Sequence, residues 1–418
     1  MASIARKNLF EDIPRFLVAQ AGIMFAVSLV TIQKGLLDGF SRSTVQVIDN
    51  SSADLWVASQ DFLHIEVSSQ LTVEQVLQAR KVAGVDRAEA LFTQGARWKS
   101  PAGQLDTVRI YAFNPDSQLF ASRWQIKAGS LAALKQPYSF LMDSTKVKDL
   151  GLEKVGDAGR IGSLPAKLVG LTSTLQSMAS STYVFTSLET GRAYILSGLT
   201  SKVDCKRFAN GEMQCVNVFE TAPKSKVSNP GPPPPKKLTL VDPITFVLVK
   251  AKPGQDLNAL RQRLEAAMPG TRVYTKAEMA EISRNYWQER TGVGFILGLG
   301  AIVGFVVGMV VVSQILYASV SDHLKEFGTL KAMGASNWVI YRVITEQALW
   351  MAILGYIPSV LACWALGHWT MAAKGIMILI TPTTAVTVFG ITVVMCIGSA
   401  IFAIQKVTRV DPAIVFKA

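Results

Sequence analysis

Residues 291–321, TGVGFILGLGAIVGFVVGMVVVSQILYASVS, form a long apolar run that carries no charged side chain between Arg290 and Asp322. A helix needs about 20 residues to cross the roughly 30 Å hydrocarbon core of a bilayer, so this run suffices. Other uncharged runs of similar character lie at residues 16–33, 347–373 and 375–405. The sequence therefore predicts four transmembrane helices, at residues 16–37, 291–320, 343–367 and 383–405, with a short extracytoplasmic loop at 368–382.

The composition fits a chain that is only partly exposed to water. Of 418 residues, 50% are hydrophobic and 17% are charged, whereas soluble domains carry about 25% charged residues. This apolar content excludes a disordered chain. The formal net charge of +12 is spread along the sequence, without a long basic run or zinc-finger spacing. It favours basic membrane flanks and a basic extracytoplasmic domain over nucleic-acid binding.

The first apolar run has two interpretations, a cleaved signal peptide and a permanent membrane helix. Its core is long, and the sequence continues as QKGLL, residues 33–37, with no A-x-A cleavage site. We therefore expect an uncleaved helix over residues 16–37. The preceding segment, residues 1–15, mixes apolar and charged side chains. That pattern suits either a short helix at the cytoplasmic interface or a frayed terminus.

Basic residues in the short segments set the orientation of the membrane helices. They gather in the N-terminal segment, in the loop at 322–342 and in the tail at 406–418, as Arg6, Lys7, Arg15, Lys325, Lys331, Arg342, Lys406, Arg409 and Lys417. The short loop between the third and fourth helices has only Lys374. We therefore expect both termini in the cytoplasm and the long segment 38–290 outside it.

Segment 38–290 mixes helix and strand patterns. Strand–helix–strand units are predicted near both of its ends, with helices at 72–82 and 256–268 and strands at 85–92, 104–113, 245–250 and 272–274. Between them, a β-rich insertion is expected at about 139–240. The proline run at 229–237 reads as a spacer or as a partner-binding motif. The predicted fold is thus an α-helical membrane protein with four transmembrane helices and a large extracytoplasmic α+β domain between helices 1 and 2.

The four cysteines divide between the two compartments. Cys363 and Cys396 lie in predicted membrane helices and are expected to be packing residues. Outside the membrane, Ala209-Asn210-Gly211 has the chemistry of a three-residue hairpin loop, and that register sets Cys205 directly opposite Cys215. An oxidising compartment permits a disulfide there, which we predict.

Motifs for catalysis are missing from the sequence. It contains no G-x-x-x-x-G-K-[ST] loop for ATP, no G-x-S-x-G elbow and no H-E-x-x-H pair. The histidines, His64, His323 and His368, fall in different parts of the predicted topology. We therefore expect no catalytic, cofactor or metal site in this chain, and a function based on movement and binding.

Glycines recur at four-residue intervals along the second membrane helix. Such spacing lets two helix backbones approach closely. The residues concerned are Gly294, Gly298, Gly300, Gly304 and Gly308. The pattern leaves two possibilities open, packing within one subunit and packing across a dimer.

The most specific stretch is SDHLKEFGTLKAMGAS, residues 321–336, between the second and third membrane helices. Drawn as a helix, it has a polar stripe through Asp322, Lys325 and Glu326, and Gly334 is suited to end it. An amphipathic helix at this place suits a lever for a cytoplasmic partner or an element resting on lipid. The pattern alone favours neither interpretation.

Residues 325–336, KEFGTLKAMGAS, resemble the E-[IF]-G-x-L-[KR]-A-[ML]-G-A motif of FtsX/MacB-type ABC transporter permeases. The architecture of one helix, a large outer domain and three further helices agrees with that family, as do Asn8-Leu9, Arg15, residues 21–23 and the tail at 409–413. Residues 181–187 and the N-terminal half resemble the DevC-like branch, found with tripartite exporters. The cysteine hairpin and the proline run depart from the pattern.

The resemblance implies a dimeric permease of the bacterial inner membrane that works with separate ATPase subunits, which bind the ATP and magnesium. The coupling helix would dock in the ATPase through Asp322, His323, Lys325, Glu326, Phe327, Gly328, Leu330, Lys331, Ala332, Met333 and Gly334. Its motion would reach the periplasmic domain and drive export of a lipid, glycolipid, lipoprotein or other amphiphile. A periplasmic adaptor, an outer-membrane channel and membrane lipid are further implied partners, and nucleic acid is not.

The main alternative within the same superfamily is a signalling scaffold. Some of its members use ATP-driven motion to regulate periplasmic cell-wall enzymes. The large outer domain of this chain favours export, because those regulators tend to have small outer domains.

Overall fold

The computed structural model describes residues 13–197, 201–207, 213–219, 232–322, 326, 328, 329 and 333–408. The chain forms two compact units. The membrane unit consists of residues 1–39 and 291–418, and the outer unit consists of residues 40–290. Each unit is described by itself below.

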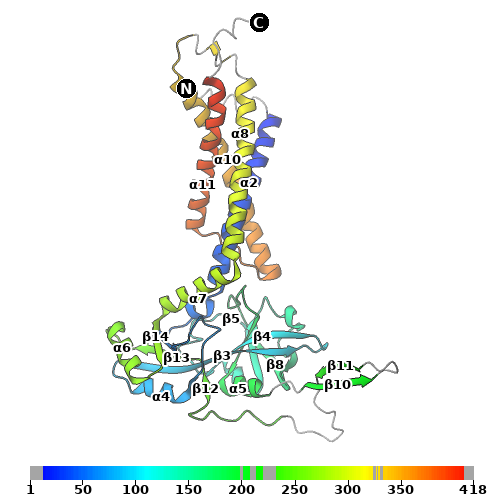
Figure 1. Cartoon of the computed structure of the whole chain (residues 1–418), viewed down its shortest axis with the longest axis vertical. Coiled ribbons are helices and arrows are strands. Elements are labelled where there is room, and N and C mark those ends of the chain that lie inside the picture. The colour runs from blue at the N-terminus through cyan, green and yellow to red at the C-terminus, as the bar shows by residue number, and fades with distance from the viewer. Residues whose placement is uncertain are drawn as a thin grey trace. The chain divides into compact units, whose positions relative to one another are not determined.

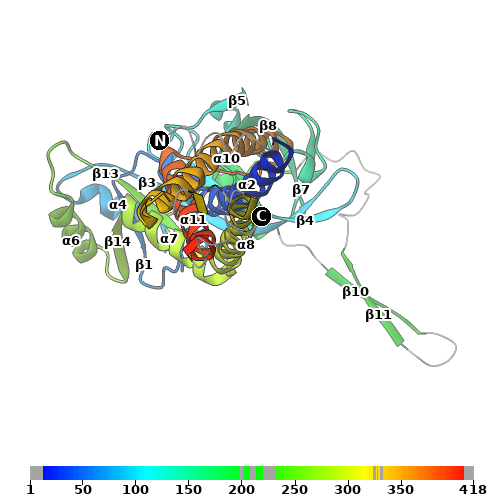
Figure 2. The ribbon, with the colours of Figure 1, turned by 90° about the horizontal axis from the view of Figure 1, so that it is seen from above.

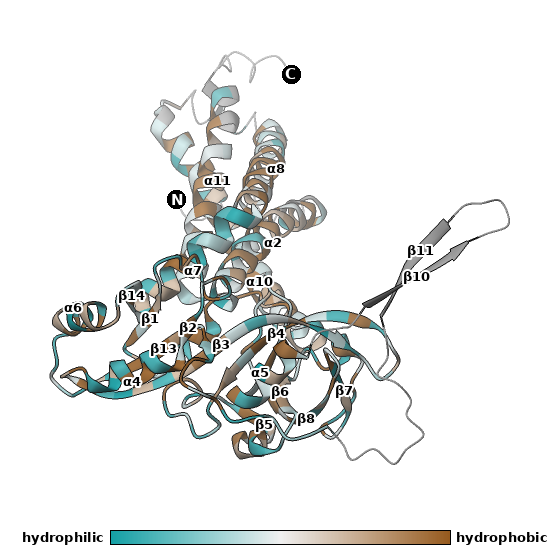
Figure 3. Ribbon diagram, turned by 60° about the horizontal axis from the view of Figure 1, so that its bottom comes forward, coloured by the Kyte–Doolittle hydropathy of each residue, from teal (hydrophilic) through white to brown (hydrophobic). Residues whose placement is uncertain are grey.

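Long apolar helices form the membrane unit. They are α2 (Ile13–Ser43), α8 (Val293–Asp322), α10 (Asn337–Lys374) and α11 (Pro382–Thr408), which run alongside one another in Figure 1 and are seen from above in Figure 2. Each contains a segment long and apolar enough to cross a membrane. Hydrophobic colour runs along α8 in Figure 3. The prediction of four transmembrane helices is confirmed.

The loop predicted at 368–382 is shorter than expected. Helix α10 continues to Lys374, so only residues 375–381 separate it from α11. No helix breaker occurs between His368 and Lys374. Gly375, with φ of +67°, ends α10 in the left-handed conformation, and Pro382 begins α11. Helix α2 is likewise longer than the predicted span of 16–37 and ends at Ser43.

The membrane unit has its own apolar core. Helix α11 packs against both α8 and α10. Residues from all four helices are buried in this core, among them Ile23, Ala26, Val312, Leu316, Ile344, Ala348, Met395 and Cys396. Cys363 and Cys396 are both free and buried.

A large mixed sheet forms the centre of the outer unit. Its ten strands are β1 (Leu55–Ser59), β3 (Val85–Lys99), β4 (Leu105–Phe113), β5 (Ile126–Gly129), β6 (Ser139–Asp143), β7 (Ala158–Ile161), β8 (Leu164–Thr172), β9 (Thr182–Ser187), β13 (Phe246–Ala251) and β14 (Thr271–Thr275). The order is β14-β1-β13-β3-β4-β9-β6-β8-β5, and β7 pairs with β3 and β8. Two neighbouring pairs, β4–β9 and β6–β8, are parallel.

Both ends of the outer segment build one α+β body, as the two strand–helix–strand units predict. Helix α4 (Val73–Lys81) follows the short strand β2 (Leu71–Thr72), which pairs with β12 (Pro243–Ile244), and α6 (Leu257–Ala267) connects β13 to β14. Local caps fix the starts of the helices: Gln75 Oε1 accepts a hydrogen bond from the Thr72 amide (2.8 Å), and Asp256 Oδ1 accepts one from the Asn258 amide (2.9 Å). Apolar residues of α4 and α6 share one core with β1 and β13.

The β-rich segment predicted at 139–240 is not a separate sheet up to residue 187. Strands β6, β8 and β9 extend the main sheet, because β9 pairs in parallel with β4, with Val184 opposite Ile110. The short helix α5 (Leu188–Leu196) follows β9 and packs on β3 and β4. Strands β10 (Ser201–Arg207) and β11 (Met213–Phe219) pair with each other in a separate two-stranded sheet. Alternating patterns identify strands but not their partners, which is why the sequence suggested an independent part.

The remaining elements of the outer unit are short, apart from one helix. Helix α3 (Gln46–Asp49) and the 3-10 turns η1 (Leu131–Lys135) and η2 (Lys148–Leu150) lie in connections. Helix α7 (Lys276–Thr291) follows β14 and buries Met279 and Ala280 in the apolar core around Trp56 and Phe246. Gly292, with φ of +63°, is the single residue between α7 and α8.

Candidate functional site

The segment between α8 and α10 holds the predicted coupling residues. Helix α8 ends at Asp322, Glu326 is helical and exposed, and Met333 with Gly334 forms a turn, the Met333 amide donating to Thr329 O (3.0 Å). Gly334 has φ of +85°, the left-handed conformation that ends a helix. The predicted residues His323, Lys325, Phe327, Leu330, Lys331 and Ala332 lie outside the described residues.

Two large apolar side chains are exposed at this connection. Met333 is 71% exposed and Trp338, in the first turn of α10, is 78% exposed. Trp338 is not among the predicted coupling residues. A tryptophan at the start of an apolar helix, directly after the motif, is the signal that would have identified it. Aromatic and methionine side chains are enriched where proteins bind one another.

The glycines of α8 differ in their surroundings. A Cβ on Gly300 would lie 2.6 Å from Gln33 Nε2, one on Gly304 would lie 3.1 Å from Leu29 Cδ2, and one on Gly308 would lie 2.7 Å from Ala26 Cβ. These three glycines therefore permit close packing of α8 on α2 within one chain. At Gly298 no described atom would lie within 4 Å of a Cβ. Gly294 belongs to the same predicted set and lies near the start of α8.

Gly308 and Gly298 offer a matched pair of substitutions. Gly308→Ala is expected to destabilise the membrane unit by about 1–3 kcal/mol, because its Cβ would meet Ala26 and Met395. Gly298→Ala is expected to leave stability unchanged or raise it by up to about 1 kcal/mol, since alanine favours helix. Thermal unfolding in detergent measures both changes. Equal destabilisation by the two substitutions would contradict the intrachain packing of Gly308. If the Gly298→Ala variant formed dimers more weakly than the unmodified protein, Gly298 would lie between two copies.

In the outer unit, helix α7 packs against a tight turn at residues 61–67. We call this turn the α7 joint. The His64 ring stacks on Tyr286 with centroids 4.0 Å apart and meets Trp287 edge-on at 5.2 Å. The Ile65 amide donates to Ser283 Oγ (3.3 Å). In the sequence His64 is an isolated histidine, and its ring contacts arise only because α7, more than 200 residues later, lies against it.

Glu66 ties the same turn to the centre of the sheet. Its carboxylate, 3% exposed, accepts hydrogen bonds from the Tyr183 hydroxyl (2.7 Å) and the Ser180 hydroxyl (2.8 Å). Arg109 Nε on β4 lies 3.3 Å from Glu66 Oε2. Burial raises the pKa of Tyr183, so its phenol stays protonated and donates. The α7 joint therefore connects α7 with β4 and β9, the parallel pair in the middle of the sheet.

His64 makes the stability of the outer unit depend on pH. Burial first, and then the positive charge of Arg109, lower the pKa of His64 from 6.5 to about 4. Between these values the unfolded chain binds a proton that the folded chain does not, so stability is lost as pH falls from 6.5 to about 4. Other groups beside the ring are Glu66, whose amide donates to His64 Nδ1, and Tyr286.

The variant His64→Phe keeps an aromatic ring that can stack on Tyr286, but this side chain has no titratable group. We expect its melting temperature to fall less than that of the unmodified protein when pH is lowered from 7 to 4.5. Differential scanning calorimetry of both proteins across this range measures the difference. Parallel curves would show that His64 does not contribute.

The hairpin of β10 and β11 has the predicted register, with Cys205 directly opposite Cys215. The disulfide remains a prediction, because these side chains lie outside the described ones. Residues directly opposite on antiparallel strands have Cα separations compatible with a disulfide. Alkylation of the denatured, unreduced protein is expected to modify Cys363 and Cys396 but not the hairpin pair. Modification of all four cysteines would contradict the disulfide.

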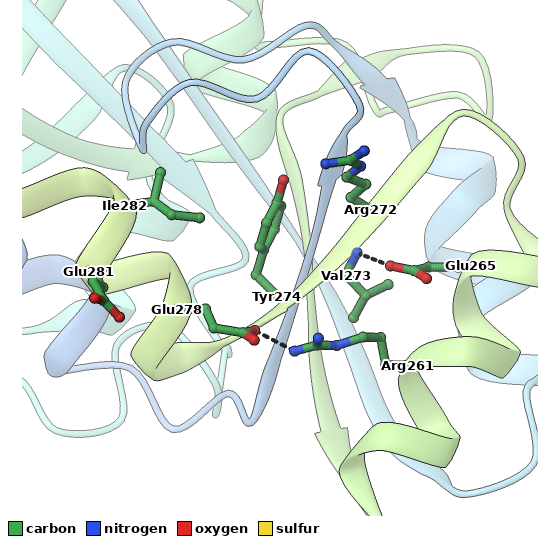
Figure 4. Close-up of a pocket in the computed structure, with 8 residues that line it drawn as sticks. All are labelled: Arg261, Glu265, Arg272, Val273, Tyr274, Glu278, Glu281 and Ile282. Atoms are coloured by element: carbon green, nitrogen blue, oxygen red, sulfur yellow. Dashed lines mark hydrogen bonds and ion pairs between the residues drawn. The ribbon is translucent and has the colours of Figure 1, made fainter. Parts of the chain in front are cut away.

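A cavity of about 310 Å³ lies beside the edge strand β14, between α6 and α7 (Figure 4). Its charged side chains are engaged with one another and with the strand. Arg261 hydrogen-bonds Glu278 and lowers the pKa of that carboxyl group. Glu265 accepts from the Val273 amide (2.9 Å) and Glu278 from the Thr275 amide (2.7 Å). These carboxylates accept hydrogen bonds from backbone amides of the edge strand β14. Those amides are then not free to pair with another strand.

Among the described residues, no group of three or more histidine, cysteine, aspartate or glutamate side chains is placed to hold a metal ion. Helix α8 leads at one end to residues 323–336, the predicted coupling segment, and at its other end, through Gly292, to α7, which packs on the α7 joint.

Comparisons with known proteins agree with this division. The model of the FtsX-like permease C-terminal family matches residues 298–412, and that of the MacB-like periplasmic core domain matches residues 16–267. A curated relative, a probable syringafactin export ATP-binding/permease protein, SyfD, of Pseudomonas syringae pv. tomato, is 21% identical over 170 residues. That match covers 40% of this chain and 25% of the relative, so this chain spans about a quarter of its length.

Solved structures of outer domains are also similar. The periplasmic region of MacB from Actinobacillus actinomycetemcomitans matches at 9% identity and a TM-score of 0.35, over 58% of this chain and 98% of that one. The extracellular domain of the noncanonic ABC-type transporter YknZ from Gram-positive bacteria matches at 8% identity and a TM-score of 0.32, over 53% and 99%. The family assignment rests on the two family models. By these matches the chain belongs to the FtsX/MacB-type ABC transporter permeases, as a multi-pass protein of the inner membrane with a MacB-like periplasmic core domain.

Proposed function

We propose that this chain is the permease subunit of an ABC exporter. A separate ATPase subunit binds and hydrolyses ATP with magnesium, and this chain contributes no cofactor of its own. The permease converts the closure of the ATPase into motion of its periplasmic domain, which drives a lipid, glycolipid, lipoprotein or other amphiphile outward. The family membership and the export function named for the curated relative support this proposal.

The observation that carries the proposal is the continuous path through α8. A push on the coupling segment displaces Asp322, the last residue of α8, and α8 passes the displacement along its 30 residues. Gly292 joins it to α7, where Tyr286 and Ser283 contact the α7 joint. Through Glu66 the motion reaches β4 and β9. In this arrangement both termini and the coupling segment are cytoplasmic, in keeping with the basic residues there.

A second permease copy is part of the proposal. Helix α8 presents an apolar stripe at helical spacing, with Phe295 76%, Leu299 50%, Ile302 61%, Val306 52% and Val310 51% exposed. Two copies packed along this stripe would place two coupling segments beside two ATPase subunits. A periplasmic adaptor and an outer-membrane channel complete the proposed exporter.

A pull-down in mild detergent from the native host tests the function. The tagged protein is isolated, and stoichiometric partners are identified and counted. We expect an ABC ATPase and a periplasmic adaptor. Recovery of an ATPase with a cell-wall enzyme or its activator would instead establish the signalling scaffold. Absence of any ATPase, under conditions that preserve a control transporter, would overturn the proposal.

A matched control separates the cytoplasmic from the periplasmic contacts. The variant Glu326→Lys is expected to lose the ATPase from the pull-down and to keep the adaptor. Loss of both partners would indicate that the variant is misfolded rather than uncoupled, which the melting temperature of the outer unit checks.

A further inference from the structure

The segment that leads into β12 crosses the outer unit as an extended chain (Figure 1), and we call residues 232–242 the proline strap. It begins with four prolines, Pro232 to Pro235, which are followed by Lys236 and Lys237. Proline fixes its own φ near −65°, and a residue that precedes proline is restricted to extended conformations. The proline run therefore favours a polyproline II helix before any partner is bound.

One end of the strap is fixed by a buried tyrosine. The Tyr138 hydroxyl donates a hydrogen bond to the carbonyl oxygen of Pro233 (2.5 Å). Tyr138 is 8% exposed, and its ring lies 6.1 Å, centroid to centroid, from that of Tyr194 on α5. This hydrogen bond holds the proline run on the surface of the outer unit.

The other end of the strap is fixed by Asp242, whose side chain is 5% exposed. The Asp242 carboxylate pairs with Arg192 of α5 (2.6 Å) and accepts a hydrogen bond from the Thr239 amide (2.6 Å). The Asp242 carbonyl oxygen accepts another from the Val73 amide at the start of α4 (3.1 Å). A flexible spacer needs no such anchors, so of the two interpretations of the proline run they favour the partner-binding motif.

Between its two anchors the strap is exposed to solvent. Pro232, Pro233 and Pro234 are exposed, and so are Lys236 and Lys237. Among the residues that the structure describes, no ion pair includes either lysine. The strap therefore presents proline rings and two positive charges on the surface of the outer unit.

Exposed apolar side chains lie beside the second anchor. Val241, the neighbour of Asp242, is 78% exposed, and Leu240 is 52% exposed. Leu196 is 71% exposed and follows Arg192 by four residues, which places both on one face of α5. Val241 and Leu196 have the highest exposure among the large apolar side chains described in the outer unit. Together with the prolines they form one surface that is suited to binding.

The chemistry of this surface indicates the kind of partner. Proline has no amide hydrogen, so residues 232–235 cannot donate to an added strand. Preformed polyproline II segments bind grooves that are lined by aromatic side chains. The two lysines favour carboxylates beside such a groove. A second copy docked by the same surface would bring these lysines close to their own counterparts, because a two-fold contact uses the same patch on both copies.

We propose that the proline strap, together with Leu196 and Val241, docks a different protein, through a groove lined by aromatic side chains and bordered by carboxylates. Aromatic rings stack on the exposed prolines, and the carboxylates pair with Lys236 and Lys237. Because the strap is extended and anchored before binding, it loses little conformational freedom in the complex. The surface lies wholly within the outer unit, and the inference stands whether or not the chain is an exporter.

Photo-crosslinking tests the contact in the full chain, in cells of the native host. A benzophenone amino acid is introduced at Pro232 or at Val241, and the adducts are identified by mass spectrometry. Leu63, 53% exposed in the α7 joint, is the control position. We expect the same protein at both strap positions, at least tenfold more of it than at Leu63, joined through a peptide that contains aromatic and acidic residues.

Charge reversal and peptide competition test the chemistry of the adduct. The double variant K236E/K237E is expected to give at least tenfold less protein adduct, because like charges would then oppose each other. Its melting temperature should stay unchanged, since both side chains are exposed. In membranes supplied with the periplasmic fraction, the peptide PPPPKKL, which copies residues 232–238, should compete for the partner, whereas AAAAKKL should not.

Adducts to phospholipid or to a second copy, in place of a different protein, would overturn the proposal. Absence of any protein adduct at the two strap positions would also overturn it. An adduct that resists both the charge reversal and the proline peptide would show that other residues hold that protein.

Discussion

Replacing Glu66 with alanine is expected to lower the melting temperature of the outer unit by about 6–12 °C. Removing one partner of a buried ion pair costs about 3 kcal/mol or more, because the remaining charge is left without compensation. In a domain of this size each kilocalorie shifts the melting temperature by about 2–4 °C. Here Arg109 would lose its carboxylate, and the hydroxyls of Tyr183 and Ser180 would lose their acceptor.

The pair Lys146–Asp149 provides the control. It is an ion pair three residues apart, with side chains 26% and 50% exposed. Asp149→Ala is expected to change stability by less than about 1 kcal/mol, as exposed pairs generally do. Scanning calorimetry of both variants gives the comparison. If Glu66→Ala were no more destabilising than Asp149→Ala, Glu66 would not anchor the α7 joint. Glu66→Gln, which keeps an acceptor without the charge, should fall between them.

Reversing the charge at Glu326 is expected to abolish coupling while leaving the fold intact. Glu326 is exposed in the coupling segment, so Glu326→Lys does not disturb a core. At the interface with an ATPase it would set a positive charge where a negative one is proposed to bind. Opposed like charges at an interface cost several kcal/mol. We expect the permease-dependent ATPase rate to fall at least tenfold, measured on the purified complex in nanodiscs.

Lys374→Glu is the matched control for this charge reversal. Lys374 ends α10, at the opposite end of the helix from the coupling segment, and is also exposed. The control is expected to keep its ATPase partner and rate. Full activity of Glu326→Lys would show that the coupling segment binds its partner by other residues, and equal loss in both variants would indicate a general effect of charge on the bundle.

Elements fixed by local chemistry were predictable from the sequence. The helices at 72–82 and 256–268 agree with α4 and α6 to within one residue at each end, because Thr72, Asp256 and their neighbours mark the helix starts. The register of the hairpin followed from the Asn210-Gly211 turn chemistry. The membrane helices followed from uncharged runs, although the end of α10 did not, since only Gly375 and Pro382 mark it.

Contacts between distant residues could not be predicted in the same way. Glu66 and Tyr183 are separated by 117 positions, and no pattern near either residue specifies the other. The parallel pairing of β4 with β9 could not be predicted for the same reason, because alternation along a strand does not identify the neighbouring strand. A useful signal was present at residues 64–66, where a histidine and a glutamate interrupt an apolar turn. Buried ionisable groups need partners, so such residues predict a contact but do not identify the partner residue.

Strand order in the outer unit sets a minimum time for its assembly. Strand β1 lies between β13 and β14, so both of its neighbours follow it by roughly 190 residues or more. At a synthesis rate of 5–20 residues per second, β1 waits about 10–40 s before either partner has been made. During that interval its five buried residues have no sheet to join. Strand β1 therefore stays without its native neighbours in the sheet during that interval and presents an apolar edge that another chain could pair with.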